Sequence, residues 1–210
     1  MKIIKPQKMN TNILENKSIR DNITSENLEY CFFENENCNN IELIDKEIEN
    51  CQFNNISMQN GKLEKVTFKD SIFENCDFSN TEFEDITFIR CEFIGCKPCG
   101  CNLSENRLYN ILFIETNIKY GNFSMARIEN VLFKQTILRN SYFQETKVKN
   151  IGFENSDLAQ AQFFKTSLKG VDLSTSNIEK IAITIEDIKG AIVDQLQAID
   201  LLYLLDVKIK

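Results

Sequence analysis

The chain of 210 residues contains no histidine, and this absence excludes the chemistry in which an imidazole acts as a general base or completes a nucleophilic triad. It also removes the commonest side-chain ligand of protein-bound metals. The sequence has no Gly-rich phosphate loop, no apolar run long enough to span a membrane and no secretory signal. We therefore expect a non-enzymatic, cytoplasmic protein with no catalytic residue, no metal and no cofactor.

A large apolar residue recurs at every fifth position, a period that fits neither an α-helix nor a β-strand. In residues 68–88, FKDSIFENCDFSNTEFEDITF, Phe occupies the first residue and every fifth one after it. We call these the central positions. From Leu28 to Ile188 they hold Phe, Leu, Ile, Met or Val at 31 of 33 steps, and the exceptions are Cys38 and Pro98. A period sustained over this length predicts a repeat architecture.

Two further regularities define the repeat unit. Two residues before each central position lies a small or β-branched residue, and two residues after it Asn, Asp or Gly is frequent, which suits a turn with left-handed dihedrals. Phe recurs at steps of twenty residues from Phe33 to Phe153, so four units complete one coil. The sequence predicts an all-β solenoid, a right-handed quadrilateral β-helix of about eight square coils, with equal rings stacked ~4.8 Å apart.

The two ends of the chain depart from the period. Residues 1–25 follow it poorly and are interpreted as an N-terminal cap or an irregular first coil, residues 26–190 as the β-helix, and residues 191–210 as a C-terminal helix and tail. Asp194 and Gln197 form a capping-box pattern at the start of that helix. Apolar residues lie on more than one side of this helix. We therefore expect the helix to cap the solenoid and to join two copies of the chain in a homodimer. The expected interface residues are Leu196, Ile199, Leu202, Tyr203 and Leu205. The alternative is a monomeric cap with an apolar surface.

Eight cysteines raise the question of a disulfide or metal site. Cys31, Cys51, Cys76, Cys91, Cys96 and Cys101 occupy the small positions, and Cys38 occupies a central one. This placement favours small buried hydrophobic side chains in a reducing compartment. Cys99 alone lies off both positions, and the CxxC that it forms with Cys96 leaves a metal site as the alternative. The role of the cluster Cys96, Cys99 and Cys101 is left open.

The net charge of −7 is distributed unevenly around the predicted square. The side containing Phe83 and the side containing Phe73 each carry five net negative charges, whereas the other two hold most of the Lys and Arg residues. An ordered acidic rod repels nucleic acid and attracts a basic groove, although an acidic surface also keeps a β-protein soluble. The candidate acidic binding face comprises Glu42, Asp45, Glu74, Glu82, Glu84, Asp85, Glu92, Glu105 and Glu115.

Pro98 occupies a central position and is the only proline within the repeat. Because proline lacks the N–H that a ladder requires, we predict a bulge or projecting loop near residues 97–107. The alternative is a distorted corner that stays in line. The predicted loop residues are Lys97, Pro98, Cys99, Asn102, Leu103, Ser104, Glu105 and Arg107.

The segments KYGNFS (119–124), FENSDL (153–158) and GAIVDQLQA (190–198), followed by an apolar helix, resemble the Qnr quinolone-resistance group of pentapeptide-repeat proteins. The resemblance implies a dimeric rod, shaped and charged somewhat like B-DNA, that binds DNA gyrase and topoisomerase IV and relieves their inhibition by quinolones. It also implies that the segment from Pro98 to Leu108 falls where that group carries a loop important for protection.

Two other functions remain open for such a chain. One is a structural scaffold or protein-interaction module with another partner, and the other is an immunity protein against a peptide toxin that targets gyrase. None of these functions requires direct nucleic-acid binding or a membrane.

Overall fold

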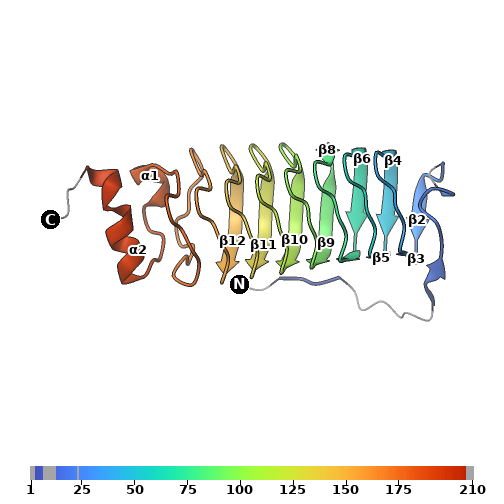
Figure 1. Cartoon of the computed structure of the whole chain (residues 1–210), viewed down its shortest axis with the longest axis horizontal. Helices are drawn as coiled ribbons and strands as arrows, with labels where there is room; N and C mark the ends of the chain where they lie inside the picture. Colours follow the sequence, from blue (N-terminus) through green and yellow to red (C-terminus); the bar gives the residue numbers. More distant parts are fainter. Residues whose placement is uncertain (1–2, 7–12, 23, 207–210) are drawn as a thin grey trace.

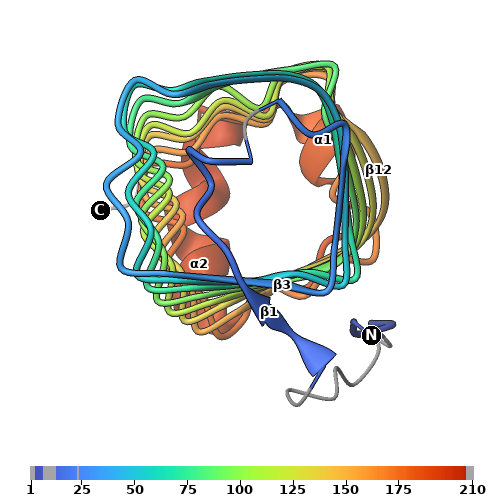
Figure 2. The ribbon, with the colours of Figure 1, turned by 90° about the vertical axis from the view of Figure 1, so that its right-hand side faces the viewer.

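The computed structural model describes residues 3–6, 13–22 and 24–206, and its body is a parallel β-solenoid with a square cross-section (Figures 1 and 2). The strands are β1 (Glu15–Asn16), β2 (Asn27–Glu29), β3 (Cys31–Glu34), β4 (Glu42–Glu49), β5 (Gln52–Asn54), β6 (Lys62–Lys69), β7 (Ile72–Glu74), β8 (Glu82–Glu84), β9 (Thr87–Ile94), β10 (Arg107–Ile114), β11 (Arg127–Lys134) and β12 (Lys147–Glu154). Two short α-helices, α1 (Ile185–Ile188) and α2 (Gln195–Asp200), and the 3₁₀ helix η2 (Leu201–Leu205) follow.

The corners of the square are left-handed residues that recur every five positions. From Tyr30 to Lys165 every fifth residue has a positive φ, for example 53° at Asn75 and 51° at Asp85. Asn and Asp tolerate this region, and Gly fills it at Gly95 and Gly100 without a Cβ penalty. The predicted turn position is confirmed.

From Asn27 onward the register between coils is a constant step of twenty residues, whereas Glu15 of β1 pairs with Cys31 of β3 across a shorter first coil. Phe93 of β9 pairs with Phe113 of β10, and Phe113 pairs with Phe133 of β11, all in parallel. Eight strands lie along one path, β1-β3-β5-β7-β9-β10-β11-β12, and therefore span seven steps. The predicted fold class, a β-solenoid with four five-residue units per coil, is confirmed.

Stacked Phe rings fill the interior in the columns that the sequence predicts. Along the column from Phe33 to Phe153, neighbouring ring centroids lie between 4.6 and 5.4 Å apart. A second column joins Phe123, Phe143 and Phe163 at 4.8 and 4.7 Å. These rings are fully buried, and each such burial stabilises the fold by roughly 1.5–3 kcal/mol.

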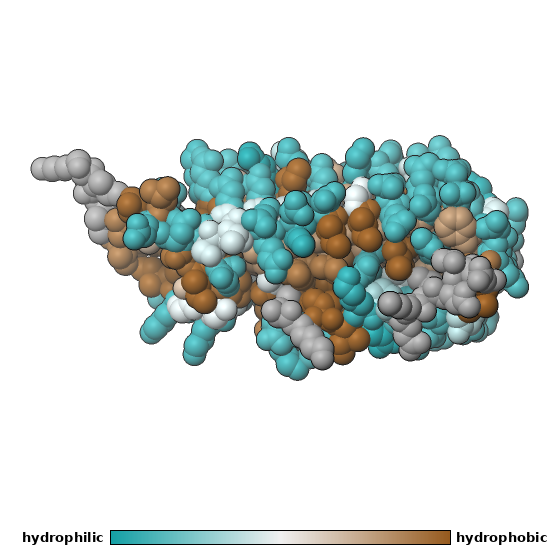
Figure 3. Space-filling model, turned by 90° about the horizontal axis from the view of Figure 1, so that it is seen from below, coloured by the Kyte–Doolittle hydropathy of each residue, from teal (hydrophilic) through white to brown (hydrophobic). Residues whose placement is uncertain are grey.

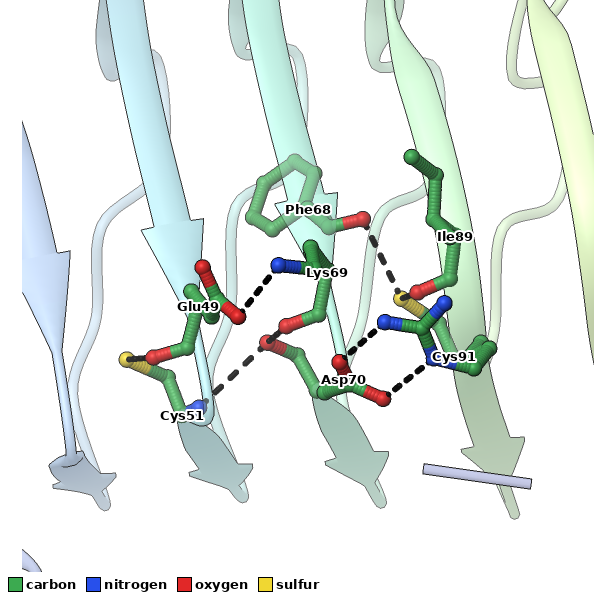
Figure 4. Close-up of polar contacts among 9 residues, drawn as sticks. Glu49, Cys51, Phe68, Lys69, Asp70, Ile89 and Cys91 are labelled. Atoms are coloured by element: carbon green, nitrogen blue, oxygen red, sulfur yellow. Dashed lines mark hydrogen bonds and ion pairs between the residues drawn. The ribbon is translucent and has the colours of Figure 1, made fainter. Parts of the chain in front are cut away.

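The small positions form hydrogen-bonded columns as well as packing. From Cys76 to Ser176, each thiol or hydroxyl at twenty-residue steps donates to the carbonyl of a central Phe 23 residues earlier, for example Cys96 Sγ to Phe73 O at 3.3 Å and Thr116 Oγ1 to Phe93 O at 3.2 Å. Cys91 makes the equivalent contact to Phe68 O at 3.5 Å on the next column (Figure 4). Cysteine therefore substitutes for Ser and Thr at these sites.

Asn106, a polar misfit at a small position in the sequence, follows the same rule. Its side chain is fully buried, where Oδ1 accepts from Ile86 N at 2.6 Å and Nδ2 donates to Phe83 O at 2.7 Å. One amide thus satisfies a backbone donor and a backbone acceptor that would otherwise lack these partners.

The two ends of the solenoid are closed differently. At the first coil β1 pairs with β3, and Ile19 is buried against the core. At the last coil α2 covers the core (Figure 1), and both hydrogen bonds of the predicted capping box between Asp194 and Gln197 are present. The parts of the expected terminal regions at 1–2, 7–12, 23 and 207–210 lie outside the described residues. None of the helices described is long and apolar enough to cross a bilayer.

Candidate acidic interface

One side of the square carries a continuous set of carboxylates, all exposed except the half-buried Glu64, and we call it the acidic face. It is the side whose central residues are Leu43, Leu63, Phe83 and Leu103, and the backbone fixes its side chains in register. Its carboxylates are Glu42, Asp45, Glu64, Glu82, Glu84, Asp85 and Glu105, against the cations Lys62 and Lys65. Of the predicted binding residues, the structure therefore brings together Glu42, Asp45, Glu82, Glu84, Asp85 and Glu105.

The two lysines neutralise only the middle of this face. Lys62 Nζ lies 3.0 Å from Glu64 Oε2 and 3.4 Å from Glu84 Oε2, and Lys65 Nζ lies 3.4 Å from Glu64 Oε1. The hydrogen bond from Lys62 lowers the pKa of Glu64, and Lys65 adds to the effect. Within residues 24–206, Glu42 and Glu82 have no ion-pair partner, so their charge is free to act on a partner.

A shallow groove of about 470 Å³ lies at the C-terminal end of the acidic face. Its floor is the buried Phe83, and its rim consists of Glu82, Glu84, Asp85, Asn102, Ser104, Glu105 and Arg107. Arg107 Nη1 lies 2.8 Å from Asp85 Oδ1 and Lys62 Nζ lies 3.4 Å from Glu84 Oε2, so Glu82 and Glu105 are the rim carboxylates without an ion-pair partner among the described residues. We call this site the Glu82 groove.

The second acidic side predicted from the sequence does not present its charge as expected. Glu92 is only 9% exposed and lies 3.1 Å from Lys5 Nζ of the N-terminal segment, so its inclusion in an exposed binding face is wrong. Glu74 is half-buried and accepts from Asn54 Nδ2 at 3.3 Å. Glu115 is exposed, but it belongs to the unit of Phe113, on the side of the square opposite the Glu82 groove.

The sequence analysis did not predict the outward apolar residues on this same side, because it considered only the charged residues of that side. Ile94 and Ile114 occupy a column that is polar in the other coils, and Ile72, Leu112 and Leu132 lie in the neighbouring column beside Glu92. Their recurrence at twenty-residue spacing is the signal that could have located them.

The predicted projecting loop at 97–107 is absent. Lys97 forms a parallel bridge with Asp77, and Asn102 forms bridges with Glu82 and Asn122, so the segment stays in line with its neighbours. Pro98 is buried at its central position and omits a single bond of the kind that Phe78 N makes to Lys97 O at 3.0 Å. One missing ladder bond does not force the chain outward, because the corner geometry and the remaining bonds are retained.

The residues expected in that loop are therefore divided between the core and the surface. Leu103 and Cys101 are buried, whereas Lys97, Asn102, Glu105 and Arg107 are exposed, and Ser104 and Cys99 are half-buried. All eight cysteines are free thiols. Within the described residues there is no group of three or more His, Cys, Asp or Glu side chains placed to hold a metal ion.

The C-terminal end of the rod presents an apolar surface. Leu196, Ile199, Tyr203 and Leu205 are 73, 48, 51 and 59% exposed, whereas Leu202 is half-buried. Gln197 anchors the segment from beneath, because its Nε2 donates to Leu173 O at 2.9 Å and to Ser176 O at 2.6 Å. Four of the five predicted interface residues are therefore exposed near the C-terminal end of the rod.

Comparison with known proteins places this geometry in context. Residues 66–136 match the model of the pentapeptide repeat region. The structure is similar to HetL, a pentapeptide repeat protein involved in heterocyst differentiation regulation from the cyanobacterium Nostoc sp. strain PCC 7120, with 12% identity, a TM-score of 0.51 and coverage of 84% of this chain and 95% of HetL. No curated protein sequence matches the chain.

A plasmid-mediated fluoroquinolone resistance protein, QnrB1, is also among the similar structures. Its trypsin-treated form is 22% identical, with a TM-score of 0.45 and coverage of 94% of this chain and 97% of QnrB1. The full-length form is 17% identical, with a TM-score of 0.39 and coverage of 86% and 99%.

The matched region and the rest of the solenoid follow one geometry. The left-handed corner residues keep the same five-residue spacing within residues 66–136 and on both sides of them. Residues 66–136 therefore contain a pentapeptide repeat region, and the coils on both sides of them have the same five-residue geometry.

Proposed function

We propose that the chain is a non-enzymatic, cytoplasmic DNA mimic that binds DNA gyrase and topoisomerase IV through its acidic face and protects them from quinolones. The observation that supports this proposal is the Glu82 groove, where Glu82 and Glu105 project from a rigid ladder without an ion-pair partner among the described residues, and Glu84 shares Lys62 with Glu64. Fixed carboxylates on a rod imitate the phosphates of a duplex and attract a basic DNA-binding channel.

We restrict the proposed topoisomerase-binding surface to one side of the rod. Because Glu92 is covered and its neighbours on that side are apolar, we assign topoisomerase binding to the acidic face alone, centred on the Glu82 groove. Protection by a projecting loop at 97–107 is not part of the proposal, since that segment lies in the ladder.

We also infer that the protein acts as a homodimer joined through Leu196, Ile199, Tyr203 and Leu205. This inference is supported by their exposure at one end of the rod, where an apolar cluster is unfavourable in water. Two-fold pairing of this end would place two acidic faces on one elongated particle.

The test is gyrase supercoiling in the presence of ciprofloxacin while the purified protein is titrated, with a parallel series without drug. Rescue of supercoiling at low protein concentration is the expected result. Inhibition alone, without rescue, would retain the DNA mimicry and remove the protection. If neither series responds, the proposal is wrong, and a scaffold with another partner takes its place.

A charge-reversal variant tests the assigned surface. We expect Glu82→Lys, Glu84→Lys and Asp85→Lys together to weaken gyrase binding at least about tenfold, because close interfacial charge pairs contribute more than 1.4 kcal/mol. The matched control reverses Glu34, Glu154 and Glu179, which are exposed elsewhere on the rod, and changes the net charge equally. Equal loss in both variants would show that net charge rather than the Glu82 groove determines binding.

A further inference from the structure

An apolar surface with Glu92 at its centre and Glu74 at its edge lies on the side of the solenoid formed by β7, β9, β10 and β11. Pairing in register places Ile72, Glu92, Leu112 and Leu132 in one outward column, with Ile94 beside Ile114 in the next. We call these six residues the Glu92 stripe. Figure 3 views the rod from below and shows hydrophobic side chains gathered along the middle of this side.

The chain's own N-terminal segment lies on this stripe. Ile4 N donates to Asn110 Oδ1 of β10 at 3.4 Å, and Lys5 Nζ lies 3.1 Å from Glu92 Oε1 of β9. Ile3 and Pro6 are half-buried, whereas Ile4 is 55% exposed. Figure 1 shows the segment returning along the outside of the rod beneath β9 and β10. The N-terminal segment thus already occupies the stripe, with Ile3 and Pro6 half-buried and with Ile4 and Lys5 exposed.

Glu92 explains why the occupant carries a lysine. Its side chain is 11% exposed and is flanked in its column by Ile72 and Leu112, so its carboxylate has lost most of its water. Among the described residues, Oε1 has no aligned hydrogen bond, and its compensation is the charge of Lys5. A nearly buried carboxylate needs a cation close by, and an apolar rim accepts aliphatic rather than polar neighbours.

The N-terminal segment is held weakly. The Lys5 side chain is 64% exposed, so water screens much of its attraction to Glu92. The hydrogen bond from Ile4 is long at 3.4 Å. Apolar side chains at Ile72, Ile94, Ile114 and Leu132 stay partly exposed beside it. A better-matched segment would bury more of this surface than residues 3–6 do.

We propose that the Glu92 stripe is a docking surface for an extended segment of a partner protein, in which an aliphatic residue lies two positions before a lysine. Residues 3–6 are then an intramolecular occupant that the partner must displace. This surface differs from the acidic face in location and chemistry, so its function does not depend on the topoisomerase assignment.

The test uses the full-length chain and a fluorescein-labelled peptide with the sequence of residues 1–8, MKIIKPQK. In Lys5→Glu the N-terminal segment is repelled by Glu92, and we expect the peptide to bind about tenfold more tightly than to the unmodified chain, because the resident segment no longer competes. Fluorescence anisotropy measures the affinities, and Lys97→Glu, on a different side of the rod, is the matched control.

A second variant identifies the group that is recognised. Adding Glu92→Gln to Lys5→Glu keeps the shape of the stripe and removes its charge, so peptide affinity should fall again by about tenfold. A peptide with Glu in place of its second lysine should bind neither form. The proposal is overturned if no form binds the peptide, if Lys5→Glu and the unmodified chain bind it equally, or if Glu92→Gln changes nothing.

Discussion

Arg90 holds the carboxylate of Asp70 across one coil with two parallel hydrogen bonds, Nε to Oδ1 at 2.7 Å and Nη2 to Oδ2 at 2.5 Å. Both residues are left-handed corners, with φ of 50° and 49°, and the Asp70 side chain is only 1% exposed. Figure 4 shows Asp70 beside the pair of Glu49 and Lys69 on the same edge. The corner that is Asn at Asn50, Asn110, Asn130 and Asn150 is here a buried ion pair.

Removing Arg90 should therefore destabilise the rod. We expect Arg90→Ala to lower the free energy of unfolding by about 3 kcal/mol, because a buried carboxylate loses its two charged donors. Arg90→Lys should recover only part of this loss, since an ammonium cannot make both parallel bonds. Urea denaturation followed by circular dichroism measures the change. Arg127→Ala, at an exposed position, should have an effect below about 0.5 kcal/mol.

Asn106 gives a second prediction about stability. Asn106→Val should cost about 3 kcal/mol, because the buried N–H of Ile86 and the buried carbonyl of Phe83 would both lose a partner. Asn106→Ser should cost less, since hydroxyls fill the equivalent role elsewhere, as Ser156 does for Thr136 N at 3.2 Å and for Phe133 O at 3.2 Å. If Val is tolerated as well as Ser in the same denaturation experiment, the hydrogen-bonding role of the small positions is wrong.

The reactivity of the cysteine thiols tests whether they are buried in the interior. Burial raises the pKa of the thiols of Cys51 and Cys91 to about 12 and that of Cys38 to about 11. A thiol whose pKa is raised stays protonated, and therefore unreactive, at pH 8. We expect Ellman's reagent to label one thiol rapidly at pH 8, the half-exposed Cys99, and all eight only after unfolding. Cys99→Ser should abolish the rapid phase, and a second rapid thiol would contradict the buried placement.

The C-terminal surface predicts the oligomeric state. Sedimentation equilibrium should show a dimer, and Leu196→Glu together with Leu205→Glu should weaken it more than about 100-fold, because each leucine contributes roughly 1.5–3 kcal/mol when buried. Ile137→Glu, which replaces a partly exposed residue far from this end, should leave the dimer intact. A monomeric unmodified chain at micromolar concentration would remove the dimer from the proposed function.

The five-residue period was enough to predict the coil, the stacked rings and the left-handed corners, because these depend on short-range geometry that every unit repeats. Phe73 and Asn75 occupy the places their unit assigns to them. The projecting loop predicted at Pro98 was wrong for a related reason. An in-line corner and a loop that adds five or ten residues both leave the five-residue period in phase. The sequence therefore could not distinguish the corner from the loop.

The binding surfaces were only partly predictable. Grouping residues by side of the square located Glu82, Glu84 and Asp85 together, as the structure has them. The same grouping counted Glu92 as an exposed acid, because charge alone does not reveal what covers it. The contact with Lys5 joins residues 87 positions apart, and no repeat relates the N-terminal segment to the coil on which it lies.

The constant step of twenty residues also determines how this gene can change length. Duplication of one coil, such as residues 107–126, would insert a unit whose outer edges match those of its neighbours, so the rod would grow by one layer of about 4.8 Å while every later side chain kept its place. Deletion of one residue would instead move each later central position out of the interior. Insertions and deletions in the gene are therefore tolerated according to their length. The rod can be lengthened or shortened most readily by whole coils.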